Sequence, residues 1–146
     1  DNTANGTAVV SGDALAWSTV SDDGVSVALT TTSADGSFAG IACTAIQTGD
    51  TTSPTTEDYV GTRNWGWIVS HGFARAKVGA GGTNNAQIGD FFITSTDSGA
   101  ITTVTARTSA LSSQVASLRE VASNGGFFFD AADTTSTLVD VFVDAS

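Results

Sequence analysis

The sequence predicts an all-β domain, barrel-like or sandwich-like, built from two related β halves with at most one short helix. Its composition is rich in Thr and Val and includes 16 Gly, whereas Pro occurs once and Met is absent. Short apolar or alternating segments are separated by Asp-Gly, Gly-Asp and Asn-Gly pairs, which is the pattern of strands joined by tight turns. Part of this pattern also occurs twice along the chain, as an internal repeat would.

Residues 1–8 are small and polar, and we expect them to form an N-terminal arm that orders only on a partner. Residues 9–146 would form a single β-rich domain, since a chain of this length can bury one real core. In its first part, turns at Asp22-Asp23-Gly24 and Asp35-Gly36 separate the apolar segments. The strands expected there lie at residues 8–10, 14–20, 25–32 and 38–46.

Residues 38–46 are too apolar to alternate, which favours a buried strand. Cys43, the only cysteine, lies within that segment, and a plain core thiol is its expected role. Because one cysteine cannot form an internal disulfide, packing or assembly must stabilise the fold. A polar, acidic, Thr-rich loop at 47–58 then separates the two halves.

The segment 63–78, RNWGWIVSHGFARAKV, combines aromatic bulk with positive charge. It holds two of the three Trp, the only His and three of the five basic residues. Read as a strand or a bent pair of strands, with Gly72 as a candidate bulge, it is large on one face and small or apolar on the other. Trp and Arg are enriched at interface hot spots. The candidate protein-interface residues are Arg63, Trp65, Trp67, His71, Phe73, Arg75 and Lys77.

The second half continues the β pattern. Residues 108–122 show near-helical apolar spacing, but their Ser content disfavours a helix, and a strand at 116–122 competes with it. Turns are expected at Asp97-Ser98-Gly99 and at Asn124-Gly125-Gly126. The strands expected are 88–96, 100–106, a buried FFFDA strand at 127–131, and an alternating strand at 138–143.

The internal repeat begins at Gly12-Asp13 and again at Gly89-Asp90. Each half would contain a Gly-Asp turn, a strand, a Gly turn, a strand and an apolar strand, over about residues 9–47 and 86–123. Duplicated β units of this kind favour a small barrel or sandwich. Chance similarity between two hairpins is the alternative.

The net charge of −10 is unevenly distributed: residues 63–119 carry all five basic residues, whereas the segments on either side carry none. Phosphate binding needs a basic surface, so we expect no nucleic-acid partner. No apolar run approaches the ~20 residues of a membrane span, so no membrane partner is expected. Either neighbouring copies meet acidic arm to basic centre, or the surface is simply acidic and solvated.

No catalytic, cofactor-binding or metal site is predicted, and the chain is not expected to be an enzyme. Ser70 and His71 are adjacent, so a strand would point them to opposite faces, whereas nucleophilic catalysis needs them in contact. One His and one Cys far apart do not make a zinc site. Trp17, Trp65 and Trp67 would suit a sugar-binding platform, but a place in the core or at a subunit interface is favoured.

The segments NWGWIVSHGFARAKV, IGDFFITSTDSGAITTV, LREVAS and LVDVFV together resemble tailed-phage capsid decoration, or cement, proteins. The shared pattern covers about residues 60–143, and this sequence departs from it at GFFFDAAD and at the possible helix over 108–117. The resemblance implies a structural protein on the virion surface that stabilises the capsid by binding the major capsid protein and neighbouring copies. It implies a homo-oligomer, with a trimer favoured on the resemblance alone, and no cofactor. A carbohydrate-binding or adhesin-type β module and a phage tail or fibre component are the alternatives.

Overall fold

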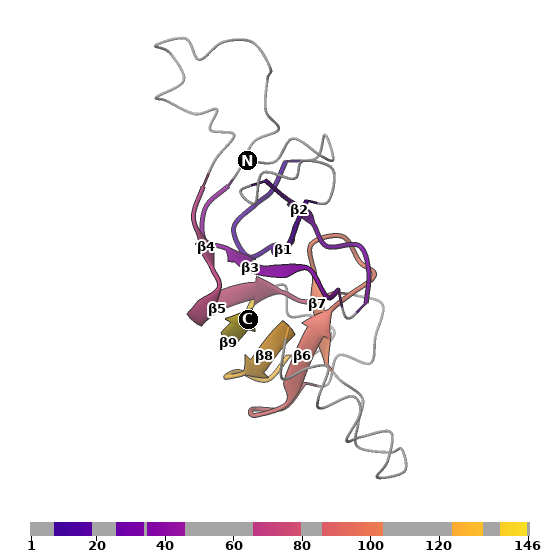
Figure 1. Cartoon of the computed structure of the whole chain (residues 1–146). Coiled ribbons are helices and arrows are strands. Elements are labelled where there is room, and N and C mark those ends of the chain that lie inside the picture. Colours follow the sequence, from indigo (N-terminus) through magenta and orange to yellow (C-terminus); the bar gives the residue numbers. More distant parts are fainter. Residues whose placement is uncertain are drawn as a thin grey trace, which may run out of the picture.

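The computed structural model describes residues 8–18, 26–33, 35–45, 66–79, 86–103, 124–132 and 138–145. Within them every regular element is a strand, and the strands form two antiparallel sheets that pack against each other (Figure 1). Neither sheet of the described residues closes on itself, so the fold is all-β and sandwich-like. Residues 1–7 of the predicted arm, the predicted turn at Asp22-Asp23-Gly24, the loop at 47–58 and the alternative helix or strand at 108–122 lie outside the described residues.

The first sheet has the strand order β2-β1-β3-β4, and the second has the order β5-β9-β8-β6-β7. The chain crosses from the first sheet to the second at Ser70, which lies between β4 and β5. The Ser70 carbonyl accepts a hydrogen bond from the Ala145 amide at 2.8 Å. The strands are β1 (Ala14–Trp17), β2 (Val27–Leu29), β3 (Phe38–Ala42), β4 (Ile68–Val69), β5 (His71–Lys77), β6 (Phe91–Thr94), β7 (Ile101–Thr103), β8 (Asn124–Phe128) and β9 (Leu138–Ala145).

The same Gly-Asp turn precedes β1 and β6. Gly12 and Gly89 adopt φ angles of 96° and 85°, which favour glycine. Asp13 and Asp90 each accept a side-chain hydrogen bond from the amide three residues earlier, at 2.8 and 2.9 Å. β1 then pairs with β2 and β3, as β6 pairs with β7 and β8. We call β2-β1-β3 the first unit and β7-β6-β8 the second unit.

A glycine occupies matching places in the third strand of each unit. Gly40 pairs with Leu15, and Gly126 pairs with Phe92. A Cβ on Gly40 would collide with the carbonyl of Val69, and one on Gly126 would collide with the carbonyl of Phe142. The prediction of a turn at Asn124-Gly125-Gly126 is therefore wrong: these residues begin β8, and Gly126 is there because the backbone of β9 passes too close for a side chain.

The main core lies between the two sheets. It joins Phe38 of β3 to Phe92 of β6 at a ring-centroid distance of 6.3 Å, and Phe92 to Phe128 of β8 at 5.8 Å. On β9, Val139, Val141 and Val143 point into this core, as the predicted alternation required. A second cluster that includes Val9, Leu15 and Leu29 covers the opposite face of the first sheet. The first sheet is thus covered on both faces.

The expected core role of Cys43 is wrong, because this residue is exposed. β3 ends at Ala42, and the chain bends immediately after it. Cys43 still donates its amide to the carbonyl of Trp67 at 2.8 Å, so its backbone is held beside β4 while its side chain faces outward. The apolar run at 38–46 therefore extends past the strand that it predicts.

Candidate functional site

A row of four phenylalanines crosses the outer face of the second sheet. The strand register places Phe73 of β5 opposite Phe142 of β9, Phe142 opposite Phe127 of β8, and Phe127 opposite Phe91 of β6. Residues directly opposite each other on neighbouring strands share one face of a sheet. Phe73 is 68% exposed and Phe91 is 43% exposed, while the two inner rings are partly covered by their neighbours. The face turned away from the core is therefore aromatic and open to solvent.

The rings of this face contact one another. Phe127 stacks on Phe142 at 5.2 Å with an interplanar angle of 17°, and Phe73 meets Phe142 edge-on at 5.4 Å. Phe129, just after β8, contacts both Phe73 at 4.8 Å and Phe127 at 5.2 Å. These distances are those of favourable aromatic pairs. We call Phe73, Phe91, Phe127, Phe129 and Phe142 the Phe cluster.

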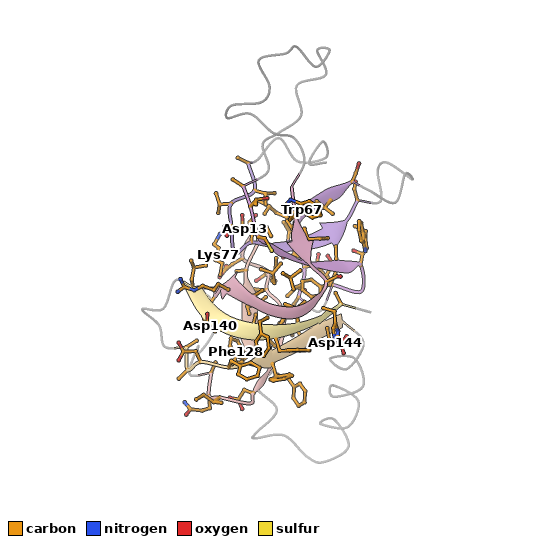
Figure 2. All side chains as sticks on the ribbon, turned by 90° about the vertical axis from the view of Figure 1, so that its left-hand side faces the viewer. Asp13, Trp67, Lys77, Phe128, Asp140 and Asp144 are labelled. Carbon is orange, nitrogen blue, oxygen red and sulfur yellow. The ribbon has the colours of Figure 1, made fainter. Side chains whose placement is uncertain are left out.

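Two ion pairs border the Phe cluster, one on each side of Phe73 along β5. Arg75 Nε lies 3.4 Å from Asp140, and His71 Nδ1 lies 3.3 Å from Asp144. Figure 2 shows Asp140 and Asp144 toward opposite ends of β9. All four side chains are exposed, so each pair contributes at most about 1 kcal/mol to stability. Arg75, Asp140 and Asp144 nonetheless place charges at both edges of the aromatic row.

These pairs bear on the uneven charge distribution. The acidic residues after position 120 meet the basic centre within a single chain, because β9 lies directly against β5. Arg75 is already paired with Asp140, so its charge is offset within the chain. The charged side chains located beside the Phe cluster are therefore Arg75, Asp140 and Asp144. An acid-to-base contact was expected between neighbouring copies, and the structure shows one within a single chain, between Arg75 and Asp140.

Lys77 has a different role from the other basic residues. Its Nζ donates to the carbonyl of Ser98 at 3.0 Å and lies 3.6 Å from Asp13 Oδ1. The Asp13 side chain is only 3% exposed, and among the described residues its Oδ1 has no hydrogen-bond donor within range. Figure 2 shows the two residues side by side. Lys77 therefore joins β5 to the turn before β1, away from the Phe cluster.

The structure brings together only some of the predicted interface residues. By register His71, Phe73, Arg75 and Lys77 share the outer face of β5, but the Lys77 ammonium group reaches Ser98 and Asp13 rather than the Phe cluster. Trp67 is 70% exposed just before β4, and Trp17 is 43% exposed at the end of β1, so a place for either in the core is wrong. Arg63 and Trp65 lie outside the described residues.

Sequence reasoning missed four members of the Phe cluster: Phe91, Phe127, Phe129 and Phe142. The run FFF at 127–129 was interpreted as buried because it is apolar. Successive residues of a strand point to opposite faces, so Phe127 and Phe129 had to share one face and Phe128 the other. Only Phe128 is buried. That alternation was the signal available in the sequence.

A groove of about 620 Å³ opens beside β5. Its walls come from Ala42, Cys43 and Val69 on the side of the first sheet, and from Phe73, Arg75 and Phe129 on the side of the second. This volume lies within the range of ligand-binding clefts. The groove therefore adjoins one end of the Phe cluster.

The described residues offer contact chemistry rather than a reactive centre. Among them no group of three or more His, Cys, Asp or Glu side chains is placed to hold a metal ion. The described part of the chain also contains no helix long and apolar enough to cross a membrane. His71 lies on an open face, bonded to Asp144, so its surroundings are those of a surface ion pair.

Comparison with known proteins identifies no family for this chain. A scan against protein-family models, a search of curated proteins and a search of solved structures each found no match to this chain. The resemblance to capsid decoration proteins therefore depends on the sequence segments alone. The function has to be argued from the Phe cluster, its flanking charges and the groove.

Proposed function

We propose that this chain is a structural protein that attaches to other proteins through the Phe cluster on the outer face of its second sheet. The observation that carries this proposal is the continuous row of phenylalanines across four strands, open to solvent. Contiguous exposed apolar patches with polar rims mark interaction sites. Interface centres are likewise enriched in aromatic residues and surrounded by charged ones.

The arrangement is suited to binding because the rings are already ordered. Phe127 and Phe142 stack on each other, and Phe73 and Phe129 pack beside them. A partner would therefore bury apolar area without first immobilising these side chains, which reduces the entropic cost of association. Burial gains about 25 cal/mol per Å² of apolar surface. The charges of Arg75, Asp140 and Asp144 would orient the partner at the rim.

The sequence resemblance gives the proposal a specific form. In that form the chain decorates the exterior of a phage capsid, where it binds the major capsid protein and neighbouring copies of itself. The homo-oligomer, and a trimer in particular, comes from the resemblance alone. A tail or fibre component would use the same kind of face at a different place on the virion.

Co-sedimentation tests this form. The full chain, mixed with tailed-phage capsid shells that lack their decoration protein, should pellet with the shells, and a Phe91→Ser/Phe127→Ser variant should bind at least tenfold more weakly. Trp67→Ser is the matched control, because Trp67 is as exposed as Phe73 but precedes β4 of the other sheet. It should bind like the wild type. Wild-type protein that stays in the supernatant would overturn the capsid form.

Sedimentation velocity without shells addresses the face itself. If the Phe cluster holds copies together, the wild type should sediment as an oligomer and the double variant should shift toward monomer. If the wild type binds neither shells nor itself, or if the double variant behaves like the wild type in both experiments, the Phe cluster is not an interaction face.

A carbohydrate-binding module is the second candidate, because Trp17 and Trp67 are both exposed. The Phe cluster does not favour it: sugars stack on open ring faces, and Phe127 and Phe142 turn their faces toward each other. Soluble glucans and chitin oligomers should change the intrinsic tryptophan fluorescence if this candidate holds. The change should then be lost in Trp67→Ser.

A further inference from the structure

His71 lies at the border of the Phe cluster and contacts it directly. Its ring meets Phe142 edge-on, with a centroid distance of 5.1 Å and an interplanar angle of 85°. Its Nδ1 lies 3.3 Å from Asp144 Oδ1. His71 is the only histidine of the chain, and histidine is the residue type that ordinarily changes charge between about pH 5 and pH 8. A ring whose charge depends on pH therefore touches the cluster.

The strand register places the pair of His71 and Asp144 one row from the centre of the Phe cluster. His71 is opposite Asp144, and Phe73, two residues along β5, is opposite Phe142. Two residues of a strand span about 7 Å, and both rows share the outer face of the sheet. A partner that covers the rings of Phe73 and Phe142 would therefore also cover or closely approach the pair.

The other charged groups near His71 can be placed strand by strand. β4, which precedes His71, and β8, on the far side of β9, contain no titratable side chain. Arg75 and Asp140 pair with each other on the other side of Phe73 along β5, and Lys77 reaches the turn before β1. Among the described residues, Asp144 is thus the charged group that His71 meets.

The charge beside the Phe cluster depends on the protonation of His71. Arg75 offsets Asp140, so with a neutral His71 the Asp144 carboxylate is the one located charge beside the cluster that has no opposite charge near it. Once His71 is protonated, Asp144 has an opposite charge 3.3 Å away. The two located pairs are then both neutral overall.

Binding makes this difference important. A partner that covers the cluster removes water from the Asp144 carboxylate, and burying an ionised group costs free energy unless an opposite charge is close. The attraction between the two charges also becomes stronger as water is excluded, since the effective dielectric constant falls. A protonated His71 therefore lowers the cost of covering Asp144. By linkage, the complex holds that proton more tightly than the free chain does.

We infer that the pair of His71 and Asp144 makes binding through the Phe cluster depend on pH, with association tightening as His71 becomes protonated. The sign follows from linkage: a proton held more tightly in the complex raises the affinity as the pH falls through the range in which histidine titrates. This inference rests on the proposed function, because it concerns the regulation of the same face.

The experiment measures the affinity of the full chain at about pH 7.5 and at about pH 5.5, on either side of the ordinary titration of histidine. The association followed is the one that the Phe91→Ser/Phe127→Ser variant loses, with capsid shells or between copies. Each variant is compared with itself, so only the ratio of its two affinities counts. The wild type should bind about three- to fivefold more tightly at the lower pH, in line with the strength of exposed ion pairs.

Substitutions at the pair isolate its contribution. His71→Gln cannot take up a proton and His71→Arg carries a permanent charge, so the ratio of affinities should fall to near one in both. Asp144→Asn removes the carboxylate, so a protonated His71 would be a lone positive charge, and the lower pH should not tighten binding. Trp67→Ser, which precedes β4 of the other sheet, should keep the wild-type ratio. Circular dichroism at both pH values verifies that each variant is folded.

The outcomes separate this inference from the proposed function. A wild-type ratio near one, or the wild-type ratio retained in His71→Gln, would overturn the inference and leave the Phe cluster as the binding face. Association that the Phe91→Ser/Phe127→Ser variant keeps at both pH values, or no association of the wild type at all, would overturn the proposed function and the inference with it.

Discussion

The two β units share their construction, but equivalent positions lie in the core in the first unit and face solvent in the second. Counted from the Gly-Asp turn, Phe91 in the second unit is the equivalent of Ala14 in the first, and by register Phe127 is the equivalent of Ile41. Ala14 and Ile41 pack in the core between the sheets. Phe91 and Phe127 lie on the solvent side of the second sheet, where they form part of the Phe cluster.

This difference shows which features of a unit depend on local sequence and which depend on tertiary packing. The Gly-Asp turn begins both units in the same way, because it depends on backbone geometry within a few residues. The glycine of the third strand depends instead on the backbone of a neighbouring strand that is distant in the sequence. Which face becomes buried depends on what packs against it. The first unit is covered on both faces, with Leu15 in the second cluster, whereas the second unit is covered on one. Large aromatic residues on the uncovered face oppose solubility, which is the physical reason to connect them with binding.

The largest expected effect comes from adjacent residues on opposite faces of β6. Phe92→Ala should lower the free energy of unfolding by about 3–5 kcal/mol, because Phe92 is fully buried and its removal leaves a cavity. Phe91→Ala, on the outer face, should cost no more than about 1 kcal/mol. Urea denaturation measures both. Equal losses of stability would mean that Phe91 is as buried as Phe92, so that both faces of the second unit are covered.

The close-approach glycines should rank next. Gly40→Ala and Gly126→Ala should each lower stability by about 1–3 kcal/mol, because the new methyl group meets the backbone of the neighbouring strand. At Gly40, the φ angle of 135° adds strain. Gly36→Ala is the control, because a Cβ there meets nothing within 4 Å, and it should change stability by less than about 0.5 kcal/mol. Stability retained in Gly126→Ala would contradict the matching roles of the two glycines.

The last comparison concerns two cations of β5, and Arg75 should show the smallest loss of stability. Lys77→Met leaves the buried Asp13 carboxylate without its cation and should cost about 1–3 kcal/mol. Arg75→Met breaks an exposed pair and should cost less than about 1 kcal/mol. Urea unfolding at low and high salt measures both losses of stability. Similar losses for the two variants would show that the contacts of Lys77 with Asp13 and Ser98 do not stabilise the fold more than the exposed Arg75–Asp140 pair does.

Much of the fold followed from the sequence, because it depends on short-range rules. The all-β class, the turns at Asp35-Gly36 and Asp97-Ser98-Gly99, and the alternation of the last strand are confirmed. In the structure, β8 takes the place in the second unit that β3 takes in the first. β8 begins at residue 124, so this strand lies just beyond the second repeat as predicted, which ends at about residue 123. Residues 104–123 lie outside the described residues.

The candidate site was harder to predict, since it requires knowing which strands are neighbours. The alternation of His71, Phe73 and Arg75 was visible along one strand. Their acidic partners and the other four rings come from β6, β8 and β9, which are distant in the sequence. Apolar character alone also misplaced Cys43 and Phe129, because an apolar run does not state where its strand ends.

The order of strands in the second sheet has a consequence for folding. β9 lies between β5 and β8, although it follows both in the chain (Figure 1). The β5–β9 ladder joins residues as far apart as His71 and Asp144, so forming it closes a long loop of chain, which costs entropy. Folding dominated by such non-local pairing is slow. During synthesis neither edge of β5 would be paired within the second sheet until β9 emerged, so the chain would be most exposed to aggregation in this interval.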